Sequence, residues 1–310
     1  MKASPQTIVV RSADQTFTSS RRWDRIKRNA TGYVFLIPTF LFIGYFLYYP
    51  AYRALVGAFT FWDGFNPPIY TGLENFRRAF DDQILRQATR NNLIWALFDV
   101  LLAIIPAFVV AELIFHIRHD GLRYFFRTLF VLPIIIPGIV SILLWRYFYQ
   151  NDGVINIILE RVGLSNLTHA WLADPATALY ALALMGLPWV NAFNMLIFYA
   201  GLQNIPKEIL EASELEGASG FRRIWTMDMP LILSQFKLLL VLAVITSGQN
   251  IVAPLVMTNG GPGYSTYTVA MYMYETAVEY GEFGYSMAIA FMLFVVILAL
   301  TAVNQRFIRD

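Results

Sequence analysis

The sequence predicts an all-α integral membrane protein whose chain crosses the bilayer six times. Hydrophobic residues make up 57% of the 310 residues and charged residues 14%, whereas soluble domains average about 45–50% and about 25%. The apolar residues also gather in long runs, each suited to a helix crossing roughly 30 Å of hydrocarbon at about 1.5 Å per residue. We therefore expect one six-span domain at residues 31–310, after a basic cytoplasmic tail at residues 1–30.

Six apolar runs define the expected spans in chain order. They cover Tyr33 to Ala58, Leu93 to Phe115, Phe125 to Tyr149, Ala176 to Leu202, Leu231 to Met257 and Phe283 to Phe307. The first run is longer than the ~7–15-residue core of a signal peptide and has no small-residue cleavage pattern. We therefore expect it to remain as a helix.

The distribution of basic residues predicts the orientation of these spans. Lysine and arginine gather in the N-terminal tail, in the second and fourth loops and at the C-terminus, and none lies in the fifth loop, residues 258–282. Cytoplasmic loops carry an excess of these residues. We therefore expect both termini to be cytoplasmic, although the first loop opposes this with Arg77, Arg78, Arg86 and Arg90.

Composition and missing motifs exclude several functional classes. The net charge of +2 is too small to indicate a nucleic acid partner, and the absence of cysteine excludes disulfides, thiolate catalysis and cysteine-ligated metals. No lysine follows a glycine, so the chain lacks the G-x-x-x-x-G-K-[ST] loop that binds ATP phosphates. His116 and His119 could touch one ion, but we interpret them as part of a basic interfacial loop. We predict no catalytic residue and no metal site.

The fourth loop, at about residues 203–230, is predicted to form a helix, a turn and a second helix. Pro206 suits a first helical position, and Glu208 and Glu211 favour the positive end of the helix dipole. Gly217 can adopt the positive φ that reverses the chain. A short helix with small residues at its tip can enter the cleft of a partner.

This loop resembles the coupling loop of ABC importer permeases. The family pattern reads EAA, three residues, glycine, and an apolar stretch closing on leucine-proline. The chain matches it from Glu211 to Pro230, with Ser213, Glu216 and Met229 in place of the usual alanine, aspartate and leucine. The leading glutamate and the turn glycine are retained.

Other segments resemble the carbohydrate, maltose-type branch of these permeases. They are Gly72–Phe76, Arg127–Pro133, Tyr199–Pro206 and the glycine- and proline-rich Thr258–Thr268. The last one looks like the outer loop after the fifth span in these permeases, where glycine and proline favour a rigid turn. The likeness covers nearly the whole chain after residue 30.

The resemblance implies a fold, a location and partners. It implies a type I importer permease bundle in a bacterial or archaeal cytoplasmic (inner) membrane, surrounded by lipid. The implied partners are a second homologous permease, two ATP-binding subunits that hold the ATP and magnesium, and an extracytoplasmic sugar-binding protein. This chain itself would hold no cofactor. The implied ATPase-coupling residues are Glu211, Ala212, Ser213, Glu216, Gly217 and Ala218.

Neutral polar side chains lie in the predicted fourth and fifth spans. Sugars need hydrogen-bonding groups for their hydroxyls and aromatic faces for their rings, and related sugar permeases contact substrate from these two helices. The candidate substrate-binding residues are Asn250, Asn191, Asn194, Ser247, Trp189 and Gln249. Each of these residues could instead join helices by hydrogen bonding, and the two interpretations remain open.

The expected function is permeation in an ATP-driven importer of a sugar or oligosaccharide. Within the same family, a polyol or glycerol phosphate is the alternative cargo, although no arginine cluster marks the predicted central spans. A stand-alone secondary transporter or channel is the alternative outside the family, with Asp99 as its best support because intramembrane carboxylates are costly and functional. The roles of Asp99 and Lys237 stay open.

Overall fold

A computed structural model describes residues 30–188 and 190–307, so most of the predicted tail and Trp189 lie outside the described residues. Helices make up 73% of the residues that the structure describes. The strands within the described residues are β1, Thr60–Phe61, and β2, Ile69–Tyr70, which pair as an antiparallel hairpin. The all-α prediction is confirmed. Two compact units divide the chain after residue 53.

The described residues of the first unit, 30–53, lie in a long apolar helix whose last residues, 54–57, belong to the second unit. Helix α2, Ala30–Ile43, continues through the π-helix η1, Gly44–Tyr48, into α3, Tyr49–Gly57. Together Gly32–Gly57 have the length and composition of a membrane span. The apolar side chains along this helix are largely exposed, as expected for a segment solvated by lipid.

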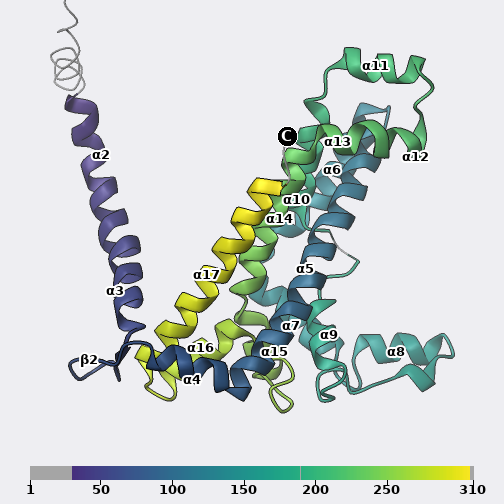
Figure 1. Cartoon of the computed structure of the whole chain (residues 1–310). Helices are drawn as coiled ribbons and strands as arrows, with labels where there is room; N and C mark the ends of the chain where they lie inside the picture. Colours follow the sequence, from purple (N-terminus) through teal and green to yellow (C-terminus); the bar gives the residue numbers. More distant parts are fainter. Residues whose placement is uncertain (1–29, 189, 308–310) are drawn as a thin grey trace, which may run out of the picture. The chain divides into compact units, whose positions relative to one another are not determined.

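The second unit is built around the 33-residue helix α5, Gln83–Phe115. Helices α10, Ala192–Gln203, and α14, Leu233–Gly248, pack along α5. Helices α16, Val269–Val278, and α17, Phe283–Phe307, pack on each other, with α16 also against α5 and α17 against α14 (Figure 1). The expectation that Leu93–Phe115 and Phe283–Phe307 form continuous spans agrees with these helices.

Shorter elements connect these helices. In chain order they are α4, Glu74–Asp81; α6, Asp120–Val131; the 3-10 helix η2, Leu132–Ile135; α7, Gly138–Phe148; α8, Val154–Arg161; the 3-10 helix η3, Ser165–Leu167; α9, Ala178–Ala183; α11, Lys207–Leu215; α12, Gly220–Arg223; the π-helix η4, Ile224–Asp228; α13, Met229–Leu231; and α15, Val252–Thr258.

The six-span count is not confirmed. By length and composition, three helices within the described residues could cross a membrane, or up to five if each of two bent pairs counts as one span. The third predicted span bends by 90° between η2 and α7, at Pro137, where a proline disfavours helix in the preceding residue. The predicted fourth span divides into α9 and α10, separated by residues 184–191, which include Gly186 and Pro188.

The predicted fifth span is also interrupted. It divides into α14 and α15 around residues 249–251. The segment that precedes α14 is bent away from it by 72°. Hydropathy reports how apolar a segment is and not whether its backbone stays helical, so these breaks were hidden within apolar runs.

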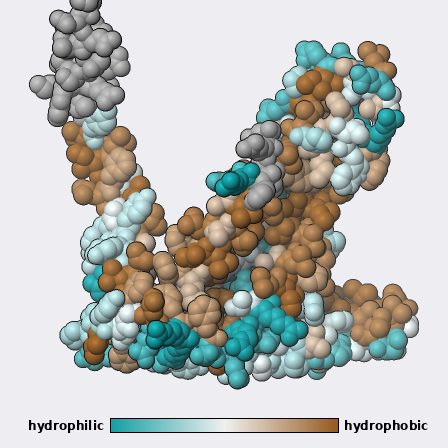
Figure 2. Space-filling view, viewed as in Figure 1, coloured by the Kyte–Doolittle hydropathy of each residue, from teal (hydrophilic) through white to brown (hydrophobic). Residues whose placement is uncertain are grey.

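Apolar side chains are widely exposed on the second unit. Figure 2 shows hydrophobic residues along the flanks of its long helices, and hydrophilic residues around α4 at one end and around α11 and α12 at the other. This distribution is that of a bundle whose middle faces lipid or other apolar helices and whose two ends face water.

Candidate functional site

The loop at residues 203–230 forms the predicted helix, turn and second helix. Helix α11 begins directly after Pro206, whose carbonyl accepts hydrogen bonds from the backbone N–H groups of Ile209 and Leu210. Gly217 has φ of 77°, as predicted, and the N–H of Ala218 donates to the carbonyl of Ser213 at 2.9 Å. A positive-φ glycine beneath such a six-to-one hydrogen bond is a Schellman turn, which ends a helix and reverses the chain.

The loop is anchored to the bundle by its inner face. Ile209 and Leu210 pack against the buried cluster that joins α5, α10 and α14. The Ser213 side chain is buried and its hydroxyl donates to the carbonyl of Leu210 at 2.7 Å. These contacts join α11 to the buried cluster that α5, α10 and α14 share.

The outer face of the loop exposes both charged and apolar groups. Glu211, Ala212, Glu216 and Gly217 are exposed, and Ala218 is half-buried. Leu215 is 91% exposed, and exposed Phe221 and Trp225 meet edge to face. Large exposed apolar side chains rimmed by charge mark a surface that another protein covers.

Three of the predicted substrate residues lie at or beside the break between α14 and α15. Ser247 is buried and its hydroxyl donates to the carbonyl of Val244 at 3.0 Å. Gln249 is exposed, and Asn250 is half-buried, with its backbone carbonyl accepting from the Thr268 hydroxyl at 2.8 Å. Gln249 and Asn250 thus lie where the helix is interrupted, and the Asn250 side-chain oxygen accepts from the N–H of Ala253 at 3.5 Å.

The other candidates lie at the start of α10. Asn191 is the N-cap, with its side-chain oxygen accepting from the N–H of Asn194 at 3.1 Å. The buried amide of Asn194 donates to the carbonyl of Ala103 on α5 at 2.9 Å. Asn194 therefore has a helix-joining contact, as Ser247 has a contact within its own helix. The hydrogen bonds of the described residues do not join the α10 group to the α14–α15 group.

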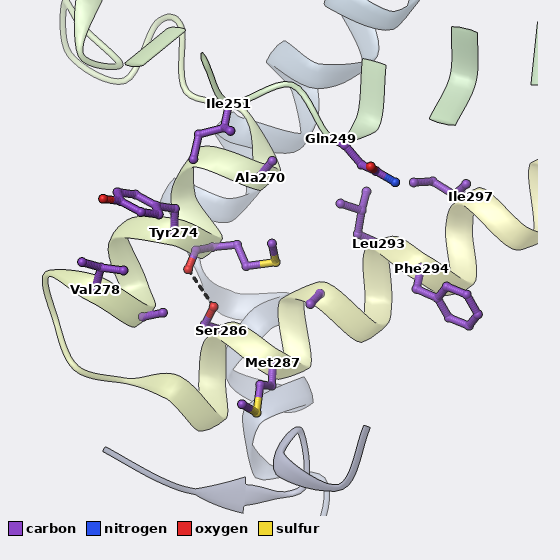
Figure 3. A pocket seen from close by; sticks show the side chains of 13 residues that line it. Gln249, Ile251, Ala270, Tyr274, Val278, Ser286, Met287, Leu293, Phe294 and Ile297 are labelled. Atoms are coloured by element: carbon purple, nitrogen blue, oxygen red, sulfur yellow. Dashed lines mark hydrogen bonds between the residues drawn. The ribbon is translucent and has the colours of Figure 1, made fainter. Parts of the chain in front are cut away.

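A cavity of about 610 Å³ lies beside Gln249, between α16 and α17. Figure 3 shows Gln249 and Tyr274 on opposite sides of it, among apolar walls that include Phe294. The Ser286 hydroxyl in this wall is engaged with the carbonyl of Met273 at 2.6 Å. The cavity has the size of a small-molecule site and the usual combination of apolar walls with a few polar groups.

Sequence reasoning missed a buried polar cluster on the inner side of the loop. Glu112 and His116 at the end of α5 meet Asp228 at the end of η4, and one ligand atom from each residue lies within 4.8 Å of the others. The buried Arg223 side chain donates to Asp228 at 3.3 Å. The sequence signal that could have revealed this cluster was a glutamate, Glu112, within an apolar run. His116 lies four residues after Glu112, and its Nδ1 is 3.5 Å from the Glu112 carboxylate.

Asp99 and Lys237 occupy the interior parts of α5 and α14. Asp99 is half-buried. The backbone carbonyl of Lys237 accepts a hydrogen bond from the Asn304 amide of α17 at 3.1 Å. Neither observation assigns a role to the charged groups.

Comparisons with known proteins give a matching family model and relatives that are similar over most of the chain. A family model described as "Binding-protein-dependent transport system inner membrane component" matches residues 12–310. The probable ABC transporter permease protein YesP of Bacillus subtilis is 31% identical over 281 residues, which cover 89% of this chain and 90% of YesP. The sulfoquinovosyl glycerol transport system permease protein SmoG of Agrobacterium fabrum is 29% identical over 312 residues, which cover 98% of this chain and 99% of SmoG.

A solved structure has the same fold. It is a bacterial alginate ABC transporter in complex with an alginate pentasaccharide-bound periplasmic protein. One of its chains matches with a TM-score of 0.77 and 20% identity, over 92% of this chain and 96% of that chain. At this identity the likeness concerns the fold alone.

Proposed function

Because this chain belongs to the family of binding-protein-dependent transport system inner membrane components, we propose that it is a permease subunit of an ATP-driven importer of a sugar or oligosaccharide. The resemblance to carbohydrate ABC importer permeases is confirmed by the family match and by relatives such as SmoG. The chain is an integral inner-membrane permease, and the ATPase of this family resides in separate subunits.

The loop at residues 203–230 is the observation that carries the ATP-coupled part of the proposal. Its outer face presents Glu211 beside exposed Leu215 and a sharp turn at Gly217, while its inner face is packed into the bundle. This combination supports a rigid connection between a cytoplasmic partner and the spanning helices. Glu211 would meet a cationic group of the motor, and Glu216 and Ala218 would flank the turn inside its cleft.

The proposed assembly contains four further chains around or above this one. They are a second homologous permease, two ATP-binding subunits that hold ATP and magnesium, and an extracytoplasmic binding protein that delivers the solute. The family description supports a binding protein as partner. The periplasmic protein in the alginate transporter complex supports docking of that partner on the extracytoplasmic side of the permease. Both termini and the coupling loop would then lie in the cytoplasm.

The proposed solute path runs past the helix break at residues 249–251. Irregular backbone at membrane depth occurs where it is buried in protein or lines a water-filled cavity. Here the break adjoins the cavity that Gln249 and Ile251 line, with the aromatic side chains of Tyr274 and Phe294 in its walls, and Asn250 lies between these two lining residues in the chain. Asn250 is the first candidate for a contact with a sugar hydroxyl. Asn191, at the start of α10, is the next.

The name of SmoG supports a solute that contains a sugar. A sugar joined to glycerol also keeps a polyol or glycerol phosphate open as cargo. A secondary transporter acting alone has less support, because the coupling loop would then have no partner.

The decisive experiment is a matched pair of glycine substitutions. Gly217 and Gly163 have nearly the same φ, 77° and 79°, and neither has atoms within 4 Å of an added Cβ. Proline fixes φ near about −65°, so Gly217→Pro and Gly163→Pro impose the same φ conflict at different places, and Gly163→Pro also removes the N–H that donates to the Glu160 carbonyl at 3.1 Å. We expect both variants to insert in the membrane.

We expect Gly217→Pro to lose sugar uptake and the co-purifying ATPase, whereas Gly163→Pro retains both. The measurements are uptake in cells and recovery of partner chains with the tagged permease in mild detergent. Normal uptake by Gly217→Pro would refute this role of the loop. Recovery of the wild-type chain without any ATPase would favour a self-sufficient transporter and direct attention to Asp99.

A further inference from the structure

Three residues with metal-binding side chains meet where α5 ends against the coupling loop. Glu112 and Asp228 are 4% and 0% exposed, whereas the His116 side chain is 39% exposed. Their ligand atoms lie within 4.8 Å of one another. The cluster is thus closed on the protein side and open toward solvent on the His116 side.

The two carboxylates lack the hydrogen-bond donors that buried acids normally have. Neither side-chain oxygen of Glu112 and only one oxygen of Asp228 has a hydrogen-bond partner within the described residues. Buried polar atoms are nearly always paired, and a buried charge without compensation is costly. Arg223 contacts the oxygen of Asp228 that is paired. Arg223 carries one positive charge, whereas Glu112 and Asp228 together provide two carboxyl groups.

A hydrogen bond of the His116 ring determines which of its nitrogens can bind a metal, and the ring nitrogen nearest the Glu112 carboxylate is Nδ1, 3.5 Å from Oε2. This Nδ1 lies 2.9 Å from the backbone carbonyl of Glu112. A carbonyl oxygen can only accept, so this hydrogen bond places the ring hydrogen on Nδ1 and leaves the lone pair on Nε2. Metal-bound histidines usually donate their other ring N–H to a carbonyl or carboxylate in this way.

We propose that Glu112, His116 and Asp228 form a binding site for a divalent transition-metal ion, with Zn²⁺ as its reference ligand. An imidazole with two carboxylates selects zinc and its first-row neighbours over magnesium and calcium, which prefer all-oxygen sites. Zinc bonds of about 2.0–2.2 Å bring donors to about 3.4 Å from each other, so metal binding requires the exposed His116 ring to turn its Nε2 toward the two carboxylates. Water completes the coordination on the open side.

A bound ion would connect the coupling loop, residues 203–230, to α5 outside the apolar cluster against which Ile209 and Leu210 pack. Asp228 lies at the end of the π-helix η4, directly before α13 and the bend that leads into α14. Glu112 and His116 lie on α5. Metal binding therefore links the base of the loop to the central helix, whichever solute the permease carries.

The test is a zinc titration of the full-length chain, purified in detergent with a tag that contains no histidine. After chelator treatment, isothermal titration with Zn²⁺ is expected to show one site per chain, and mass spectrometry of the metal content should agree. Glu112→Gln and His116→Gln should each weaken this binding by at least about tenfold. Mg²⁺ should not compete at equal concentration.

His169 and Asp174 provide the matched control. They form another histidine–carboxylate pair, 2.6 Å apart, without a third ligand from the described residues. Asp174→Asn should leave the zinc stoichiometry and affinity unchanged. Because His116 is half-exposed, its variant tests the site even if a change at Glu112 prevents folding, and a zinc-dependent rise in melting temperature gives a second readout.

Equal zinc affinity in the wild type and in His116→Gln would overturn the proposal, as would the absence of stoichiometric zinc from the wild type. Either result would mean that Glu112, His116 and Asp228 do not together form a metal site. Neither result would affect the proposed transport function, which is tested separately at Gly217.

Discussion

The two ends of helix α5 carry acidic residues with opposite surroundings. At the first end, Asp82 accepts hydrogen bonds from the backbone N–H groups of Ile84 and Leu85 at 2.8 and 3.0 Å. It also accepts from the hydroxyls of Tyr272 and Tyr285 at 2.6 and 2.7 Å. At the other end, both oxygens of Glu112 lack a hydrogen-bond partner among the described residues.

Asp82 is an acid whose hydrogen bonds join three helices, whereas Glu112 is a proposed metal ligand. Burial raises the pKa of Asp82, but the tyrosine and backbone hydrogen bonds outweigh it, so the pKa of Asp82 is lowered overall. The negative charge is therefore stabilised by donors from α5, α16 and α17. Glu112 has no equivalent donors and can be stabilised by a metal ion instead.

The largest expected effect is the loss of Asp82. Asp82→Ala removes the N-cap of α5 and leaves two tyrosine hydroxyls without their acceptor. Lost caps cost about 0.5–2 kcal/mol and unsatisfied buried donors about 1–3 kcal/mol, so we expect a destabilisation of about 2–4 kcal/mol. Thermal unfolding in detergent measures it. The control is Asp174, whose side chain is 34% exposed, lies 2.6 Å from His169 and accepts from the N–H of Ala176. Asp174→Ala should cost less than about 1 kcal/mol.

The same carboxylate predicts a pH dependence with a defined sign. Because the folded pKa of Asp82 is lowered, its stabilising effect is fully present above the unfolded pKa of about 3.9 and disappears as the pH falls through the folded pKa. The melting-temperature difference between wild type and Asp82→Asn should thus be largest near neutral pH and shrink below about pH 4. A difference that grows with acidification would contradict this account.

The same contrast shows what the sequence could predict. Apolar runs identified the membrane class and the long helices, and local backbone chemistry identified the turn at Gly217, because these depend on neighbouring residues. The breaks around Pro188 and Gln249 and the meeting of Glu112 with Asp228 depend on tertiary packing. Residues 116 positions apart in the chain meet without any periodic signal that a single sequence displays.

Glu112→Gln tests the contrast between the two ends of α5, because we expect it to stabilise the chain in the absence of metal, whereas Asp82→Ala destabilises it. In chelator, the substitution replaces a buried carboxyl group whose oxygens have no hydrogen-bond donor among the described residues, so we expect it to stabilise the chain by about 1 kcal/mol. With saturating Zn²⁺ the wild type should gain stability and Glu112→Gln should not, which reverses their order. Melting curves with and without zinc measure both states. Destabilisation by Glu112→Gln in chelator would show that its oxygens have protein donors after all.

The smallest effect is expected beside Asp82, at the ion pair of Arg78 with Glu282. Both guanidinium contacts are short, at 3.0 and 2.7 Å, and the group lies 4.0 Å from the centre of the Tyr285 ring, but the side chains are 49% and 32% exposed. Exposed pairs contribute about 0.2–1 kcal/mol and are screened by salt. Arg78→Gln should therefore cost about 0.5 kcal/mol at low salt and less in 1 M salt.

A double-mutant cycle with Glu282→Gln isolates the pair, because Arg78 keeps its ring contact when Glu282 is neutral. If the coupling energy exceeds the effect of Asp82→Ala, the exposed pair and not the buried carboxylate holds this end of α5. Arg78, and not Asp82, would then be the residue that distinguishes the first end of α5 from the end at Glu112. A small coupling that salt removes leaves Asp82 as the group that fixes α5 to α16 and α17.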